Sequence, residues 1–273
     1  MSTAILPVAP LPDCRPATPV AAPSTVFLPK EHGSWSLVLE PLALGLLVAP
    51  SWAGGALAGV VLAGFFARRP LKAALLPAYS LRRVVARETL VMWSALVVAG
   101  LFEVMVLAPW TALWPLLPVA GLGAVFLHCD AQGESRAAAA EVAGSAAFAG
   151  VPAAMASLAG WPPSGALALG VLVLARSVPA VLAVRGYLRR RKEGTPAGGG
   201  ALLSAGAAAL LLGGLAWVGA VPWLAAGLGG LLLARTCWLL GPWRPAWPAR
   251  HVGMFEAVVG LLYVTAITCA YSS

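Results

Sequence analysis

The sequence predicts an all-α fold, a polytopic membrane helix bundle of about nine transmembrane helices. Three observations predict it. The chain has 273 residues, of which 60% are hydrophobic and 10% charged, whereas a soluble domain carries roughly a quarter charged residues. Apolar runs close to the length that crosses a bilayer, about 20 residues, follow one another almost from end to end. Lysine and arginine gather in alternate connectors between those runs.

Residues 1–26 differ from the rest of the chain, because they are rich in proline and alanine and show no periodicity. The closely spaced prolines would break a helix here. No continuous apolar core follows a basic start, so a signal peptide is not indicated. We therefore expect a flexible tail at 1–26 and a single transmembrane helical domain at 27–273.

Nine apolar runs are interpreted as transmembrane spans. Their approximate bounds are 34–50, 52–67, 89–108, 111–128, 138–159, 165–184, 201–218, 220–240 and 253–271. The first two spans are divided at Pro50-Ser51-Trp52, and the fifth is rich in alanine and carries Glu141. A model with eight or ten spans would spoil the alternation of charge described next.

The basic residues predict the orientation of the chain. Apart from Arg176 and Arg235, which fall inside spans, they precede the first span or lie in the connectors after the second, fourth, sixth and eighth spans. The connectors after the first, third, fifth and seventh spans contain no lysine or arginine. Basic connectors of membrane proteins face the cytoplasm. We therefore expect a cytoplasmic N-terminus and, with nine spans, a C-terminus outside.

The net charge of +8 does not indicate nucleic-acid binding, because the basic residues occupy short connectors and form no separate basic domain. The expected partner is the lipid bilayer, with anionic lipids at the cytoplasmic face. The four cysteines are far apart and form no CxxC pair, so neither a metal site nor a disulfide framework is indicated. No cofactor is predicted.

Ionisable residues inside the spans are the candidate functional residues, because a charge in a bilayer is costly and usually has a role. Helical rise places most of them in the cytoplasmic half of the membrane and only Glu103 in the outer half. They are interpreted either as ion pairs that fix helix register or as the lining of a cytoplasm-facing polar cavity that binds a ligand or relays protons. The candidate cavity residues are Glu31, His32, Glu40, Glu141, Arg176, Arg235 and Glu256.

Several of these residues lie in short motifs, namely PKEHGSW at 29–35 with Glu40-Pro41, Arg-Pro-Leu-Lys at 69–72, the Glu-Ser-Arg…Ala-Glu…Gly run at 134–144, Arg176-Ser177 leading to Val184-Arg185, and Gly253-Met254-Phe255-Glu256. Through these motifs the chain resembles the YwiC-like family of bacterial integral membrane proteins. The PKEHG segment is the most specific of them. The resemblance implies a multi-pass protein of the bacterial cytoplasmic (inner) membrane, and loosely an association with anaerobic nitrate respiration. It implies no established reaction.

The number of spans and the long connectors after spans two, four and six are also similar to the UbiA superfamily of intramembrane prenyltransferases. Those enzymes bind prenyl diphosphate through Mg²⁺ held by Asp-rich motifs after spans two and six, but the corresponding connectors here are basic. A basic mouth formed by Arg68, Arg69, Lys72 and Arg185 could bind a phosphate or carboxylate headgroup without metal, or simply the anionic leaflet.

Three functional hypotheses follow. The protein could bind or transport a small polar, anionic or lipid-like ligand through its cavity. It could be a UbiA-like enzyme that modifies a lipid or quinone without the usual metal motifs, or an accessory membrane subunit linked to nitrate respiration. The sequence contains no GxxxxGK[ST] loop, so transport would not be driven by that class of ATPase. No catalytic residue is predicted.

Overall fold

The computed structural model describes residues 32–74, 81–132, 137–194 and 198–272. These residues form nine α-helices and one short 3₁₀ helix, with no strand among them. The helices are α2 His32–Val48, α3 Trp52–Ala74, α4 Leu81–Leu107, α5 Leu116–Ala131, α6 Ala138–Leu158, α7 Pro163–Glu193, α8 Gly199–Trp217, α9 Trp223–Leu240 and α10 Ala249–Ser272, and η1 is Trp110–Leu113. The predicted all-α class is therefore confirmed for the described part of the chain.

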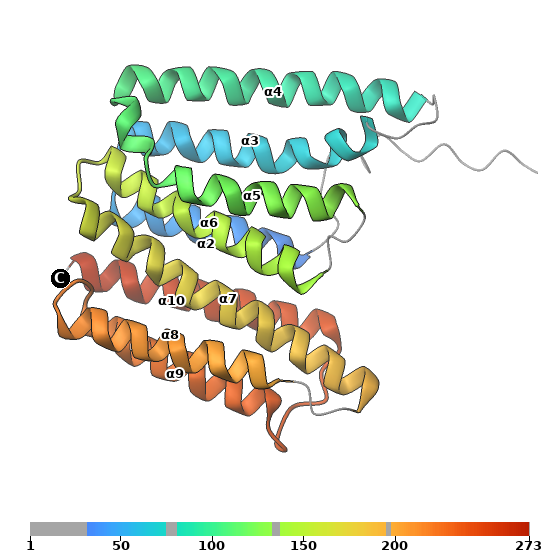
Figure 1. Cartoon of the computed structure of the whole chain (residues 1–273), viewed down its shortest axis with the longest axis vertical. Helices are drawn as coiled ribbons and strands as arrows, with labels where there is room; N and C mark the ends of the chain where they lie inside the picture. The colour runs from blue at the N-terminus through green and yellow to red at the C-terminus, as the bar shows by residue number, and fades with distance from the viewer. Residues whose placement is uncertain (1–31, 75–80, 133–136, 195–197, 273) are drawn as a thin grey trace, which may run out of the picture.

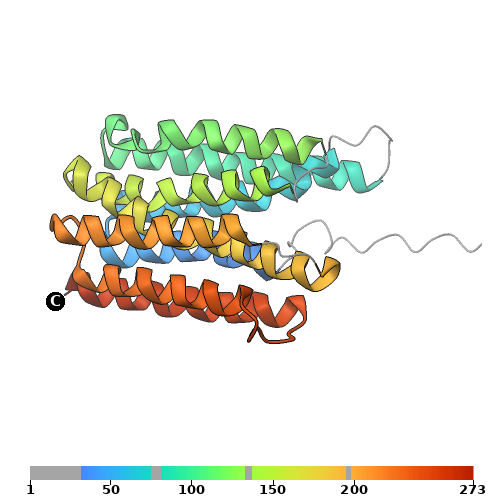
Figure 2. The same ribbon diagram turned by 60° about the horizontal axis from the view of Figure 1, so that its bottom comes forward.

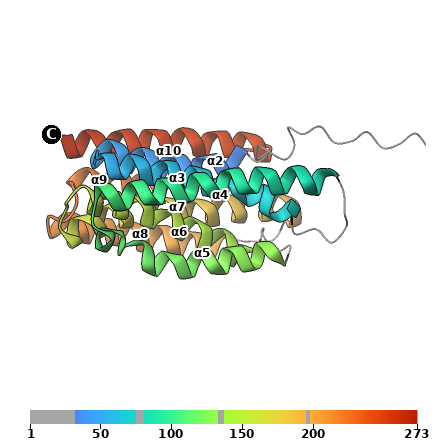
Figure 3. The ribbon, with the colours of Figure 1, turned by 90° about the horizontal axis from the view of Figure 1, so that it is seen from above.

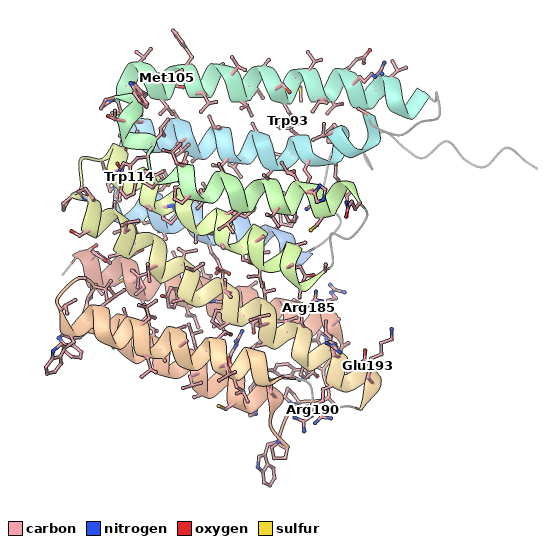
Figure 4. All side chains as sticks on the ribbon, viewed as in Figure 1. Trp93, Met105, Trp114, Arg185, Arg190 and Glu193 are labelled. Atoms are coloured by element: carbon pink, nitrogen blue, oxygen red, sulfur yellow. The ribbon has the colours of Figure 1, made fainter. Side chains whose placement is uncertain are left out.

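The helices run roughly along one direction, and consecutive helices point in opposite directions (Figures 1 and 2). Helices α3, α5, α7 and α9 consequently end at the same end of the bundle, which we call the basic end. Arg185, Arg190 and Glu193 lie at this end, whereas Met105 and Trp114 lie at the other (Figure 4). The described connectors at the opposite end, residues 49–51, 108–115, 159–162 and 218–222, contain no lysine or arginine.

Six helices are long and apolar enough to cross a membrane among the residues described, namely α4 from Val84 onward and α6 to α10. Helices α2 and α5 contain shorter apolar stretches, Trp35–Val48 and Leu116–Cys129. This composition defines a multi-pass membrane protein. Several helices extend past the predicted spans, as α7 does to Glu193, because arginine and lysine are good helix formers and continue the helix beyond the apolar run.

Two tight turns at the opposite end have the same backbone conformation and hydrogen bonding. Gly160 and Gly219 follow α6 and α8 with φ of 81° and 73°, a left-handed conformation that glycine adopts without steric cost. In the first turn the N–H of Trp161 bonds the carbonyl five residues earlier at 3.0 Å, and the equivalent bond in the second turn is 2.8 Å. Such bonds end a helix sharply. Pro162 and Pro222 are the N-cap residues that directly precede the next helices, which produces two antiparallel hairpins, α6–α7 and α8–α9.

Helices α6 and α7 are the most enclosed of the candidate spans, with more than half of their apolar stretches buried, whereas α4 is almost entirely uncovered. Helix α4 lies at one edge of the bundle beside α3 (Figures 1 and 3). Helix α10 packs beside α2, so the last helix contacts the first described helix. The packing of α10 against α2 brings polar residues from distant parts of the chain together inside the bundle.

Tryptophan marks the opposite end of the bundle. Trp52, Trp110, Trp217 and Trp223 lie at helix ends there, and all four are largely exposed. Tryptophan is enriched where a membrane meets water, because its ring is apolar and its N–H is polar. These four tryptophans therefore indicate an interface with water at the end that lacks basic residues.

Candidate functional site

Four ionisable side chains from four helices meet inside the bundle and form what we call the charge cluster. Its members are Glu40 of α2, Arg176 of α7, Arg235 of α9 and Glu256 of α10. Helical rise places Glu256 about 10 Å from the start of α10 at the basic end, and Arg176 about 20 Å from the start of α7 at the opposite end. The charge cluster therefore lies in the half of the bundle nearer the basic end.

Arg176 is the centre of the charge cluster and is only 4% exposed. Its Nη1 lies 3.4 Å from Glu256 Oε2, and its Nη2 donates a 2.8 Å hydrogen bond to the backbone carbonyl of Glu256. The same Nη2 lies 3.6 Å from Glu40 Oε1. This last contact is the longest of the three, so Glu40 is the most loosely held partner of Arg176.

Glu256 is shared by both arginines, because its Oε2 also pairs with Arg235 Nη2. Arg235 Nη1 lies 3.2 Å from the hydroxyl of Thr236, which in turn donates to the carbonyl of Leu232 at 2.8 Å. The two arginines and two glutamates carry no net charge together. Mutual pairing offsets part of the free-energy cost of removing these groups from water.

Glu40 fits against α10 because residue 260 is glycine. A Cβ at Gly260 would overlap the carboxylate of Glu40. Gly260 lies four residues after Glu256 and therefore on the same face of α10. Pro41 follows Glu40 within α2, and a proline leaves the carbonyl four residues earlier without its helical partner. A glycine on α10 and a proline on α2 thus occur where the carboxylate of Glu40 approaches α10.

Several buried polar atoms of the charge cluster have no hydrogen-bond partner among the described residues. They are Nε of Arg176, Nε of Arg235 and Oε1 of Glu256, together with the hydroxyl of Ser177 beside Arg176. Buried polar groups are normally paired, because an unpaired group loses its hydration without compensation. Two of these atoms are guanidinium donors, which suit an additional acceptor oxygen or an anion.

Other predicted site residues lie elsewhere. Glu141 does not contact the charge cluster but pairs with Arg185, at 2.6 Å between Oε2 and Nη1. Glu141, which was predicted to line the cavity, thus pairs with Arg185, which was predicted to belong to the basic mouth. Arg68 lies over the ring of Phe126, 4.6 Å from its centroid. Glu103 is exposed on α4, four residues before that helix ends.

Some of the remaining predicted site residues lie outside the part of the chain that the structure describes. Glu31 and the predicted tail at 1–26 lie outside the described residues, as do the side chains of His32 and Lys72. Arg69 is in the last two turns of α3, near the basic end. No group of three or more histidine, cysteine, aspartate or glutamate residues in the described ranges could hold a metal ion.

Sequence reasoning missed Thr236 and Gly260, which contact or accommodate the charged residues. A usable signal existed for Gly260, because its spacing from Glu256 places it on the same helix face. Thr236 follows Arg235 directly, and a threonine hydroxyl within a helix often bonds a carbonyl of the preceding turn. The spacing of Gly260 does not identify its partner helix, which depends on the packing of α10 against α2.

A second polar assembly fixes the basic end. The hydroxyl of Tyr187 donates to the carbonyl of Pro245 at 2.6 Å, lies 3.0 Å from the carbonyl of Trp247, and accepts the Trp247 N–H at 2.9 Å. Arg190 and Arg191 bond the carbonyls of Leu240 and Trp247. Helix α7 therefore extends past the bundle to hold the connector between α9 and α10, residues 241–248.

These features define a class: a multi-pass helical membrane protein with a buried, charge-balanced cluster near its basic end. Residues 28–156 match the model of the YwiC-like protein family, so this part of the chain is similar to that family. The matched part contains Glu40 and Glu141, whereas Arg176, Arg235 and Glu256 follow it. No curated protein and no solved structure matches the chain.

Proposed function

We propose that this protein binds, and carries across a bacterial cytoplasmic membrane, a small anion that pairs with Arg176. In this proposal the chain crosses the membrane nine times, the basic end faces the cytoplasm, and the ligand reaches the charge cluster from that end. The basic residues around the end raise the local concentration of anions, because an opposite charge attracts them over several ångströms.

The observation that carries the proposal is the pair of unpartnered guanidinium nitrogens, Nε of Arg176 and Nε of Arg235. Both side chains are less than one tenth exposed, so water of the bulk solvent does not satisfy these donors. Guanidinium groups favour planar oxyanions, because two N–H groups can bond two oxygens at once. A carboxylate or a similarly shaped inorganic anion supplies such oxygens.

Glu40 supports the same proposal as a displaceable partner. Its carboxylate is 17% exposed, more than any other member of the charge cluster, and lies 3.6 Å from Arg176. An incoming anion could therefore replace Glu40 at Arg176 while Glu256 keeps its three contacts with the arginines. The unpartnered Oε1 of Glu256 would accept from a water or a ligand hydroxyl that accompanies the anion.

The test is binding of chloride, nitrate and acetate to the purified full-length protein, measured by calorimetry and by the shift in thermal stability. We expect at least one of the three to bind the wild type. Arg176→Gln should weaken that binding at least tenfold, because the main donor is lost. Arg189→Gln, which removes an exposed arginine of the same helix, is the matched control and should bind as the wild type does.

A folding defect in Arg176→Gln is separated from a binding defect by a second variant. Arg176→Met combined with Glu40→Leu removes one positive and one negative charge, so the charge cluster remains balanced. Replacing a buried ion pair by apolar residues is often neutral for stability. This double variant should fold and should not bind the anion; binding with wild-type affinity would refute the proposal, as would a wild type that binds none of the three anions.

A further inference from the structure

We infer that Glu40 couples anion binding to the uptake of one proton, so that anion and proton enter the charge cluster together. This inference rests on the proposed function and assigns the coupling step to one carboxyl group. It follows from the charges of the charge cluster, from the position of Glu40 at its edge, and from the fit of Glu40 against Gly260.

The first argument is charge balance. Glu40 and Glu256 each carry one negative charge, Arg176 and Arg235 each carry one positive charge, and their sum is zero. A monovalent anion that joined them would leave one net negative charge inside the bundle. An unbalanced charge is expensive in the interior of a membrane protein. One proton on a glutamate restores the balance, because the carboxylate then becomes a neutral acid.

The second argument identifies the glutamate. Glu256 pairs with both arginines and also accepts a hydrogen bond at its backbone carbonyl. Protonating Glu256 would therefore weaken contacts to two cations at once. Glu40 contacts one arginine at 3.6 Å and is the more exposed of the two. Its protonation costs the fewest interactions.

The third argument concerns the groups that face Glu40. Helix α2 packs against α3, α6, α7 and α10. Arg176 of α7 contacts Glu40. Glu256 and Tyr263 of α10 and Arg235 of α9 are near enough to interact with it electrostatically. The hydroxyl of Tyr263 donates a 2.9 Å hydrogen bond to the carbonyl of Leu172.

The charged residues of the other two helices that pack on α2 lie elsewhere. On α6 the charged residue is Glu141, which pairs with Arg185. On α3 they are Arg68, Arg69 and Lys72, in the last two turns. The carboxyl of Glu40 is therefore the group of the charge cluster best placed to gain a proton when Arg176 binds another anion in place of Glu40.

Gly260 makes the exchange sterically possible. Because residue 260 has no side chain, the carboxylate of Glu40 occupies the space that a Cβ would fill. The carboxyl group can remain there after protonation, as a neutral acid against the backbone of α10, while the anion takes its place at Arg176. A neutral carboxylic acid is far cheaper to bury than a carboxylate.

The experiment measures protons taken up when chloride, nitrate or acetate is added to the full-length protein in weakly buffered detergent solution near neutral pH. All three anions are fully ionised there, so any proton gained belongs to the protein. We expect roughly one proton per bound anion for the wild type, and an affinity that falls about tenfold for each unit rise in pH. In Glu40→Gln the charge cluster already lacks that negative charge, so an anion that binds this variant should bring no proton with it, and its affinity should not depend on pH.

The control is Glu193→Gln, which removes a carboxylate of an exposed pair with Arg189 on α7 and should leave proton uptake unchanged. Anion binding by the wild type without proton uptake would overturn the inference and leave the proposed function standing. Proton uptake by Glu40→Gln equal to that of the wild type would overturn it too. A wild type that binds none of the anions overturns the proposed function and this inference together. The wild-type measurement decides the question even if Glu40→Gln does not fold.

Discussion

Arg176 and Glu256 are joined twice, once through their side chains at 3.4 Å and once through a 2.8 Å hydrogen bond to the backbone carbonyl of Glu256. The second bond ties the guanidinium to the backbone of α10 as well as to its carboxylate. Since Glu256 also pairs with Arg235, three helices are held at one point. The glutamate is therefore the most consequential single charge in the bundle.

Replacing Glu256 by leucine should strongly destabilise the protein. Arg176 and Arg235 would both lose an ionised partner, and a buried charge left without its partner costs about 3–5 kcal/mol. Denaturant or thermal unfolding in detergent measures this loss. The matched control is Glu193→Leu, which disrupts an exposed i,i+4 pair with Arg189 worth about 0.3–0.5 kcal/mol. Equal stability of the two variants would contradict the assigned pairing.

Gly260→Ala should disturb Glu40 directly. The added methyl group would overlap the carboxylate, and overpacking of this kind costs about 1–3 kcal/mol. The control is Gly253→Ala on the same helix, where a Cβ would meet no neighbouring atom within 4 Å; that variant should be neutral or slightly stabilising. Thermal stability of the two purified variants distinguishes them, and indistinguishable melting temperatures would rule out a close approach of α2 to α10 at this point.

Tyr187→Phe should loosen the connector between α9 and α10. The variant loses the hydroxyl that bonds Pro245 and Trp247. These partners are only partly buried, so we expect a loss of about 1 kcal/mol, the lower end of the range for an unsatisfied polar group. Hydrogen exchange at residues 241–248 should rise, while exchange in α6 should stay as in the wild type. Tyr271→Phe, near the other end of the bundle, serves as the control. Unchanged exchange in the connector would show that α7 does not hold it.

Labelling from the two sides of the membrane tests the proposed orientation. In a variant without the four native cysteines, we expect a cysteine at Val218 to react with a membrane-impermeant maleimide in intact cells. Val218 is exposed at the turn between α8 and α9. A cysteine at Lys192 should react only after the membrane is opened, because basic segments remain in the cytoplasm. The reverse result would invert the bundle and move the proposed ligand entrance to the outside.

The sequence alone determined the helical class, the approximate bounds of the helices and the separation of a basic end from an end without basic residues. These properties are local, since the free energy of placing an apolar segment in lipid depends on that segment's own residues. The same reasoning identified Glu40, Arg176, Arg235 and Glu256 as buried charges, because an ionisable residue inside an apolar run is visible without any knowledge of its neighbours.

Only the tertiary structure shows which of the charged side chains form ion pairs with one another. Nothing in the spacing of Glu141 distinguished it from Glu40, yet Glu141 pairs with Arg185 while Glu40 reaches Arg176. The difference arises from helix packing: α10 returns beside α2, and the small residue at 260 lets Glu40 approach. Pairing across helices depends on relative rotation and depth, which are set by the shapes of facing side chains and not by the hydropathy of either helix alone.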